Sequence, residues 1–172
     1  MSINLLPLKM LIDAPVGDAN RDTELEEMMK TAKQELITIL GFSFDATENI
    51  TEKAKIKKRL YTKVRPITTV NSLTLGGVEL TEDEDFINWG RYIEILGDTF
   101  YNIEPDGVFF EIDYDGGIDP ETDAYRPYNE VMALIAFEKL NIKKPIQPYT
   151  ATDYRTPTAI QNKIEGLKDW DF

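Results

Sequence analysis

Residues 113–119, with the sequence Asp-Tyr-Asp-Gly-Gly-Ile-Asp, come nearest to a spacing that could bind an ion. Their spaced aspartates resemble the opening of a calcium-binding loop, in which oxygen ligands recur along the chain. The later positions do not fit an EF-hand. Gly117 stands where a fifth-position oxygen is needed, Ile118 where glycine is needed, and Ala124 where a bidentate glutamate should stand. The pattern therefore indicates a tight strand-to-loop turn, with weak cation binding as the alternative.

Two other acidic groups, residues 82–85 and the set Asp119, Glu121 and Asp123, could act as acid–base pairs only inside a pocket. No such pocket is predicted, so solvated carboxylates are expected. The chain has no histidine and no cysteine, which removes the commonest general base, thiolate nucleophile and zinc ligands. No Walker loop, dinucleotide fingerprint or nucleophile elbow occurs. We expect no enzyme, no catalytic residue, no cofactor and no metal, and keep a carboxylate hydrolase only as a third hypothesis.

The charge is unevenly distributed along the sequence. The net charge is −12, yet residues 51–65 hold seven basic residues against the single acid Glu52, a local charge of +6 that leaves −18 for the remainder. Such a basic band is ordinarily a solvated face. The alternative is a contact with an acidic neighbour or with DNA phosphate, for which Lys57 and Arg59 are the candidate residues. Specific recognition of duplex DNA is not expected.

The composition predicts a soluble protein with a single core. A chain of 172 residues that is 42% hydrophobic matches the usual length of one domain. Residues 1–10 lack a signal-peptide pattern, and no run approaches the roughly 20 apolar residues of a membrane helix, so no membrane partner is expected. The absence of cysteine is compatible with synthesis in the cytosol.

A first amphipathic helix is predicted over residues 22–40. Thr23 and Glu26 match a capping box at its start, and Gly41 supplies a left-handed stop. Apolar residues recur at intervals of three and four, at Leu25, Met28, Met29, Ala32, Leu36, Ile39 and Leu40. This spacing gives one apolar face over about five turns.

A second helix, over residues 127–140, is apolar around most of its circumference. Pro127 suits its first turn, and Asn141 with Pro145 ends it. A helix that is apolar nearly all round is buried nearly all round. It must therefore lie at the centre of its domain or press one face against another subunit. The second option makes four of its residues candidate interface residues: Val131, Leu134, Ile135 and Phe137.

Between the two helices, the sequence predicts a small antiparallel β-sheet, so the fold class is α+β. Residues 42–49 read as a loop, and residues 50–61 suit a short helix or a strand, with extended structure from Leu60 onward. Arg65-Pro66 keeps the residue before the proline out of the helical region. Gly76-Gly77 marks a hairpin over residues 67–80. Further strands are predicted over residues 86–90, 91–96 and 108–114.

The two ends of the chain flank a core domain predicted over residues 22–144. Residues 1–21 form an N-terminal docking segment, extended or loosely ordered, that is too apolar for a free tail. Residues 145–172 form an extended C-terminal arm with one possible helix, around residues 158–167. Its aromatic side chains are candidate interface residues: Tyr149, Tyr154, Trp170 and Phe172. The alternative is a strap across the domain's own surface.

The order of these elements resembles a known family of virion proteins. The acid-rich helix ending in Gly41 is followed by Arg65-Pro66-Ile67, the hairpin at Gly76-Gly77, and a strand that runs from Phe110 into Tyr114 and Gly117. A proline-started apolar helix comes next. Over about residues 22–142 this series is similar to the head–tail connector (adaptor, or head-completion) proteins of tailed bacteriophages. Two features depart from the family's pattern: the usual basic or amide-rich end of the last helix is replaced by Glu138-Lys139-Leu140-Asn141, and the 28-residue tail has no counterpart.

The resemblance implies a structural protein of the phage neck, located in the virion and made in the host cytoplasm. Such connectors form a ring, commonly of twelve copies, beneath the portal protein, where they extend the DNA channel and dock a stopper or tail-completion protein. The implied partners are therefore other copies of the chain, the portal, the stopper or tail, and packaged DNA in non-specific proximity. The second hypothesis is an acidic adaptor that binds a protein or peptide partner in another multiprotein assembly without forming a ring.

Overall fold

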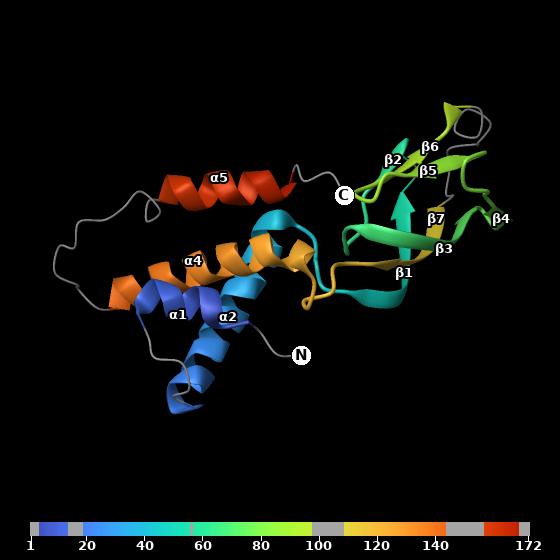
Figure 1. Cartoon of the computed structure of the whole chain (residues 1–172). Coiled ribbons are helices and arrows are strands. Elements are labelled where there is room, and N and C mark those ends of the chain that lie inside the picture. The colour runs from blue at the N-terminus through green and yellow to red at the C-terminus, as the bar shows by residue number, and fades with distance from the viewer. Residues whose placement is uncertain (1–3, 14–18, 56, 98–108, 144–156, 169–172) are drawn as a thin grey trace. The chain divides into compact units, whose positions relative to one another are not determined.

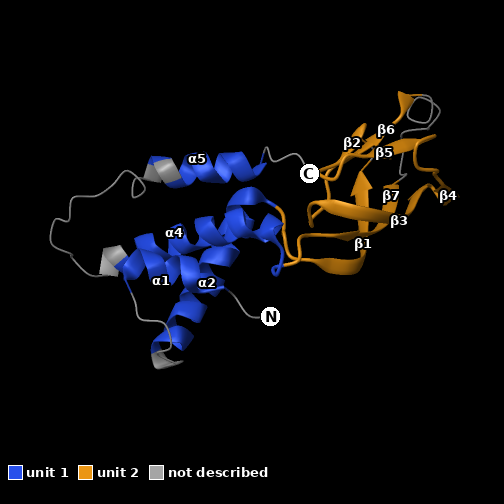
Figure 2. Ribbon diagram, viewed as in Figure 1, with its two compact units in different colours: residues 1–41, 120–170 blue, residues 42–119, 171–172 orange. Residues whose placement is uncertain are grey.

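The computed structural model describes residues 4–13, 19–55, 57–97, 109–143 and 157–168. These residues form two compact units (Figure 2). Unit 1 contains residues 1–41 and 120–170, and unit 2 contains residues 42–119 and 171–172. Each unit is described by itself. The predicted division into segments 1–21, 22–144 and 145–172 stays a prediction.

Unit 1 consists of helices (Figure 1). They are α1 (Leu6–Ile12), α2 (Ala19–Leu40), the short 3₁₀ helix η1 (Asp123–Tyr125), α4 (Arg126–Lys143) and α5 (Pro157–Lys168). The predictions of helices near residues 22–40, 127–140 and 158–167 are confirmed. Helix α4 runs past the predicted stop at Asn141, because Pro145 disfavours the helical conformation only in the residue directly before it.

Two predictions for the first 40 residues are wrong. Residues 6–12 form helix α1 instead of an extended lead-in, with Pro7 in the first turn and Leu8 completely buried. Helix α2 begins at Ala19, so Thr23 lies in its second turn and does not cap it. The predicted stop is confirmed, since Gly41 has a φ of +78° and its amide donates to the Ile37 carbonyl at 2.9 Å.

Helix α4 lies at the centre of unit 1. Helices α1, α2 and α5 of the same chain all pack against it. Its buried side chains include all four candidate interface residues, Val131, Leu134, Ile135 and Phe137, together with Met132, Ala133 and Ala136. Of the two ways to cover this helix, the structure shows central placement. The apolar surface of α4 is covered by its own chain. It therefore gives no reason to expect contact with a second subunit.

Ion pairs join the helices of unit 1. Lys9 of α1, which is itself buried, lies 2.5 Å from the Asp22 carboxylate of α2. Lys139 of α4 pairs with Glu35 of α2 at the surface. Helix α5 contributes Ile160, Ile164 and Leu167 to the core. The helical part of the predicted C-terminal arm therefore packs on its own chain.

Unit 2 consists of β-strands. They are β1 (Thr47–Lys55), β2 (Arg59–Leu60), β3 (Ile67–Leu75), β4 (Val78–Glu79), β5 (Phe86–Asn88), β6 (Ile93–Ile95) and β7 (Phe109–Gly116). They form a four-stranded sheet in the order β1-β7-β3-β4 and a three-stranded sheet in the order β2-β6-β5. All pairings between these strands are antiparallel. The α+β class is confirmed, although two sheets replace the single predicted sheet.

Strand pairing in unit 2 decides between the helix and the strand that the sequence leaves open after residue 50. Residues predicted as a loop over 42–49 enter β1 at Thr47, and residues 50–55 and 59–60 are extended in β1 and β2, not helical. The predicted hairpin is confirmed, because Leu75 pairs with Val78 across a two-residue turn. Gly76 and Gly77 have φ of +59° and +85°, the left-handed pair that a type I′ turn requires. The two sheets share one apolar core that includes Phe86, Ile93, Phe110 and Ile112.

Candidate functional site

A group of arginines and tyrosines gathers on the three-stranded sheet of unit 2. The Arg59 guanidinium lies 5.0 Å from the centre of the Tyr92 ring, and the Arg91 guanidinium lies 5.8 Å from the same ring. Tyr92 in turn lies 5.7 Å from Tyr61, and Arg65 lies 5.0 Å from the Tyr61 ring. We call these five residues the cationic aromatic face. Cation–π contacts hold each arginine over a ring and leave guanidinium N–H groups at its rim.

Arg65 is held in this face by a hydrogen bond and by two aromatic rings. Its Nε–H donates to the Thr62 carbonyl at 3.1 Å, and its guanidinium also lies 4.7 Å from the Phe42 ring. Burial lowers the pKa of Arg65, while the nearby Tyr61, Tyr114 and Glu52 act to raise it. An arginine retains its proton under such a shift. Arg65 therefore contributes a fixed, half-buried positive charge.

A hydrogen-bonded network around Tyr114 anchors the segment that carries Tyr61 and Arg65. The Tyr114 hydroxyl accepts from the Val64 amide at 3.2 Å and donates to the Glu52 carboxylate. The same carboxylate accepts from the Lys63 amide at 2.9 Å. Burial, followed by the hydrogen bond to Glu52, raises the pKa of Tyr114 to about 12. The segment ends at a cis peptide bond between Arg65 and Pro66.

The cationic aromatic face has the composition of a protein-binding surface. Tyr61 is 56% exposed. Arginine and tyrosine are enriched among residues that dominate binding energy, because they combine apolar area with directed hydrogen bonds. Guanidinium groups also form paired hydrogen bonds with carboxylates and phosphates. This surface can therefore bind an acidic partner.

Several residues of the predicted basic band are partly neutralised by neighbouring strands. Lys53 forms an ion pair with Glu111, its partner in the β1–β7 register. The Lys58 ammonium lies 3.7 Å from a Glu94 carboxylate oxygen on β6. Lys57 and Arg59, the two predicted interface residues of the band, are exposed. Their role at an interface stays a prediction.

The other predicted interface residues fall into two groups. Val131, Leu134, Ile135 and Phe137 are buried in unit 1. Tyr149, Tyr154, Trp170 and Phe172 lie outside the described residues. Sequence reasoning missed Tyr61, Tyr92 and Arg91, because only the pairing of β2 with β6 brings residues 59 and 92 together.

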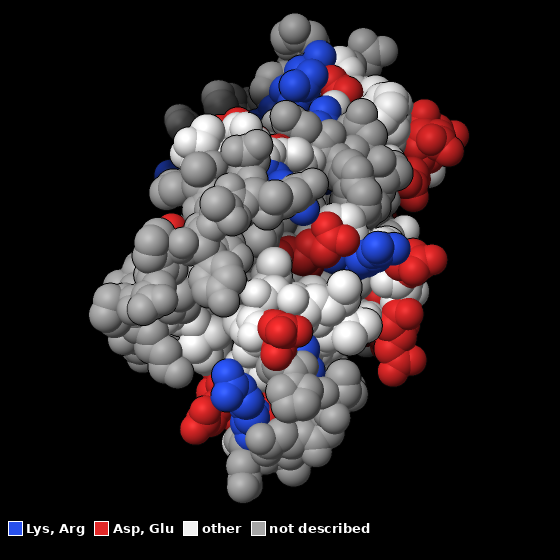
Figure 3. Space-filling view, turned by 60° about the vertical axis from the view of Figure 1, so that its left-hand side comes forward, with Lys and Arg blue, Asp and Glu red and all other residues white. Residues whose placement is uncertain are grey.

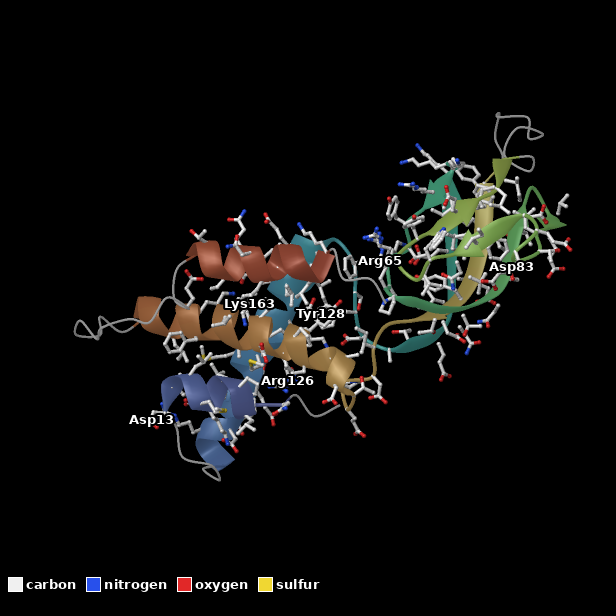
Figure 4. The ribbon with its side chains drawn as sticks, turned by 45° about the horizontal axis from the view of Figure 1, so that its top comes forward. Asp13, Arg65, Asp83, Arg126, Tyr128 and Lys163 are labelled. Carbon is white, nitrogen blue, oxygen red and sulfur yellow. The ribbon has the colours of Figure 1, made fainter. Side chains whose placement is uncertain are left out.

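Unit 1 carries a groove on its surface. A groove of about 770 Å³ runs between α1, the start of α4 and one residue of α5. Leu6 and Met10 of α1 line it and are 53% and 75% exposed. On its polar side, the Glu130 carboxylate lies 3.3 Å from both Arg126 and Lys163, the latter two labelled in Figure 4. The groove is amphipathic and carries charges of both signs.

The acidic segment at residues 113–119 ends strand β7 and begins a turn. Residues 113–116 belong to β7, and Gly117 follows with a φ of +90°, so the predicted strand-to-loop turn is present. Among the described residues, no group of three or more acidic side chains is placed to hold a metal ion. Within the same described residues, no helix is both long enough and apolar enough to cross a membrane. Figure 3 shows acidic and basic side chains beside one another in several small groups on one face.

Comparison with solved structures identifies several chains of similar fold. A chain from the neck of an empty gene transfer agent particle, computed with C6 symmetry, aligns with a TM-score of 0.59 at 15% identity, over 100% of this chain and 94% of that one. A chain from the virion of the native gene transfer agent particle aligns with a TM-score of 0.55 at 15% identity, over 97% and 89%. The present chain shares its fold with these particle chains.

A third chain, from the neck of the native particle computed with C12 symmetry, aligns with a TM-score of 0.52 at 16% identity, over 95% and 91% of the two chains. No protein-family model matches the sequence, and no curated protein matches it. The likeness therefore concerns the fold, and it agrees with the resemblance to phage head–tail connectors found in the sequence.

Proposed function

We propose that this protein is a structural component of the neck of a phage or phage-like particle, where it forms a ring at the head–tail interface. In this proposal the ring extends the DNA channel beneath the portal protein and docks a stopper or tail-completion protein. The protein acts in the virion and has no catalytic role. Twelve copies per ring are proposed.

One observation carries the proposal, namely the alignment of the whole chain with a chain from a particle neck. An alignment that covers 100% of this chain and 94% of the other includes both the helical and the β-unit, so the resemblance is not limited to a common motif. The neck particles were computed with C6 and C12 symmetry, which fits a ring of twelve. The sequence resemblance to connectors supports the same role independently.

The charge of the chain is compatible with a channel wall. With a net charge of −12, most of its surface repels phosphate. A strongly basic wall would release counterions from DNA and bind it tightly, which would slow its passage. An acidic wall would let DNA slide through the channel without adhering to it.

A second candidate function is favoured by the packing of α4. Because this helix is covered by α1, α2 and α5 of its own chain, the fold does not need other copies to hide apolar surface. The protein could then serve as a monomeric acidic adaptor that binds a protein or peptide partner in another multiprotein assembly.

Native mass spectrometry separates the two candidates. The protein is measured alone and after mixing with the portal protein of the same particle. Twelve copies of 19.7 kDa add roughly 236 kDa to the portal ring, whereas a monomeric adaptor adds one or a few copies without a fixed ring stoichiometry. Low-resolution imaging of labelled particles provides the second measurement. A label located away from the neck would contradict the proposed function.

A further inference from the structure

The three-stranded sheet of unit 2 has two edge strands of opposite charge. Its order is β2-β6-β5, so β2 and β5 each have one side that no strand of this sheet covers. Both edges are short, with two residues in β2 and three in β5. Short edge strands flanked by charge are a common protection against unwanted strand pairing. Here, however, the two edges carry opposite signs.

The edge at β2 is basic. Lys57, Lys58 and Arg59 are consecutive and exposed. Arg59 lies over the Tyr92 ring, and the Lys58 ammonium lies 3.7 Å from a carboxylate oxygen of Glu94 on β6. This edge continues into the cationic aromatic face. An acidic group that reached it would meet several preorganised positive charges.

The edge at β5 is acidic. Glu82, Asp83 and Glu84 are exposed and precede the strand in a turn over residues 81–85. The turn closes through two hydrogen bonds, from the Asp85 amide to the Thr81 carbonyl at 2.8 Å and from the Thr81 amide to the Asp85 carboxylate at 2.9 Å. The three exposed carboxylates are therefore held on a firm turn, not on a free loop.

The turn lies along the outer side of β5. The Asp85 carbonyl accepts from the Leu96 amide, which places that carbonyl toward β6. The neighbouring Phe86 carbonyl must point the other way, because backbone groups alternate along a strand. It accepts from the Asp83 amide at 2.8 Å. Figure 4 shows Asp83 on the side of unit 2 away from Arg65 of the cationic aromatic face.

These charges select one kind of contact between copies. Two β2 edges repel each other, and so do two β5 edges, which disfavours a twofold dimer through either edge. A β2 edge and a β5 edge attract, and such a head-to-tail contact leaves one free edge of each sign for the next copy. Repetition of this contact closes a ring when the rotation per copy is right.

We infer that the acidic turn at residues 82–84 of one copy docks on the basic edge at residues 57–59 and the adjoining cationic aromatic face of the next copy. The partner is thus a second copy of this chain, and the contact is heterologous. This inference rests on the proposed ring and specifies which surfaces build it. It also gives a role to Lys57 and Arg59 that does not depend on DNA.

Zero-length cross-linking tests the contact on the unaltered protein. Chains labelled with ¹⁴N and ¹⁵N are mixed, alone and with the portal protein, and treated with a carbodiimide that joins a lysine to a carboxylate in direct contact. Cross-links between Lys57 or Lys58 and residues 82–84 are expected to join chains of different label. The Lys58–Glu94 pair, within one chain, serves as the internal control because it should carry a single label.

The outcomes distinguish the inference from the proposed function. Mixed-label cross-links confined to other sites would overturn the inference and leave the ring intact. A complete lack of mixed-label cross-links, with and without the portal, would contradict the ring as well. Cross-links to portal residues in place of residues 82–84 would show that the basic edge serves a different partner, and would also overturn the inference.

Charge reversal provides the second measurement. The variant K57E/K58E/R59E and the variant E82K/D83K/E84K should each weaken self-association by at least about tenfold, because each makes both edges alike in sign. An equal mixture of the two should restore it, since the acidic edges of one variant can meet the basic edges of the other. The matched control E24K/E48K changes exposed acids outside both edges and should leave assembly unchanged. Failure of the mixture to restore assembly, with both variants folded, would overturn the inference.

Discussion

Gly117 shows how one residue can fix the path of a turn. Its φ is +90°, and a Cβ added at this position would collide with the backbone of Asp45. Gly77 has a similar φ of +85°, but a Cβ there would meet no atom within 4 Å. Alanine substitutions at the two glycines therefore separate the free-energy cost of the left-handed backbone conformation from the cost of the steric collision.

Replacement of Gly117 by alanine should lower the free energy of unfolding by about 3 kcal/mol, the sum of left-handed strain and overpacking. The control Gly77→Ala should lower it by only about 1 kcal/mol, since strain alone remains. Urea denaturation of both variants measures the difference. Equal losses would show that the Asp45 backbone moves aside without cost.

Tyr114 makes the stability of unit 2 sensitive to alkaline pH. Its pKa is raised from 10 to about 12 by burial and by the Glu52 hydrogen bond, so the folded state retains the proton that the unfolded state loses. Its contribution is present in full below pH 10 and is lost as the pH rises toward 12. Tyr128 in unit 1 has its pKa raised to about 12 by burial and adds to the same decline.

The variant Tyr114→Phe should lower the free energy of unfolding at pH 7 by about 1 kcal/mol, because the Val64 amide loses its acceptor. It should also show a smaller decline in stability between pH 10 and 12 than the unaltered protein. Denaturant titrations at several pH values measure both effects. A decline of unchanged steepness would indicate that Tyr114 already loses its proton at its ordinary pKa.

At the scale of single residues, the sequence predicts those residues whose role depends on their neighbours in the chain. It does not predict residues that only strand pairing brings together. The glycines of the 76–77 turn and the turn at Gly117 follow from rules that concern neighbouring residues alone. The cationic aromatic face depends on the register between β2 and β6, which joins Arg59 to Glu94 and places Tyr92 nearby. No pattern along the chain specifies that register, because both strands are too short to show a period.

At the scale of elements, α5 determines whether the C-terminal region acts as an arm or as a strap. Ile164 is buried against the other helices of unit 1, while the adjacent Glu165 is exposed. Ile164→Ala should therefore lower the free energy of unfolding by about 3 kcal/mol, through lost apolar burial and the cavity that remains. The control Glu165→Ala should change it by less than about 0.5 kcal/mol.

Thermal and urea unfolding of these two variants provide the measurement. Removal of residues 145–172 extends the test, because the strap alternative predicts a less stable chain and the arm alternative predicts a stable chain that fails to assemble. If Ile164→Ala were as stable as the unaltered protein, the packing of α5 on unit 1 would contribute little. The structure favours the strap for residues 157–168.

The elements also show where periodicity is informative. The apolar circumference of α4 correctly predicts a helix that is buried nearly all round, but a wheel does not tell which surfaces cover it. Its neighbours are α2, which the sequence predicts as a helix, α1, which it predicts as extended or loosely ordered, and α5, which it places in an arm. A seven-residue helix such as α1 has too few positions to establish a period, so its hydrophobic residues predict only an apolar docking segment.

At the scale of the whole molecule, charge should govern assembly. Raising the salt concentration from about 0.1 M to about 1 M shortens the Debye length from about 10 Å to about 3 Å. Contacts between the basic and acidic edges should then weaken, and the apparent dissociation constant of self-association should rise by at least about tenfold. Sedimentation velocity across this salt range measures the effect. Association that strengthens with salt would indicate an apolar interface in place of a charged one.

The order of the two units along the chain has a consequence for biosynthesis. Unit 1 is assembled from both ends of the chain, and unit 2 is inserted between Gly41 and Pro120. On the ribosome, the β-strands of the insertion emerge completely before α4 exists to cover α1 and α2. The apolar faces of α1 and α2 therefore remain unburied while the β-strands are synthesised. The first 41 residues reach their final packing only after α5 has been translated.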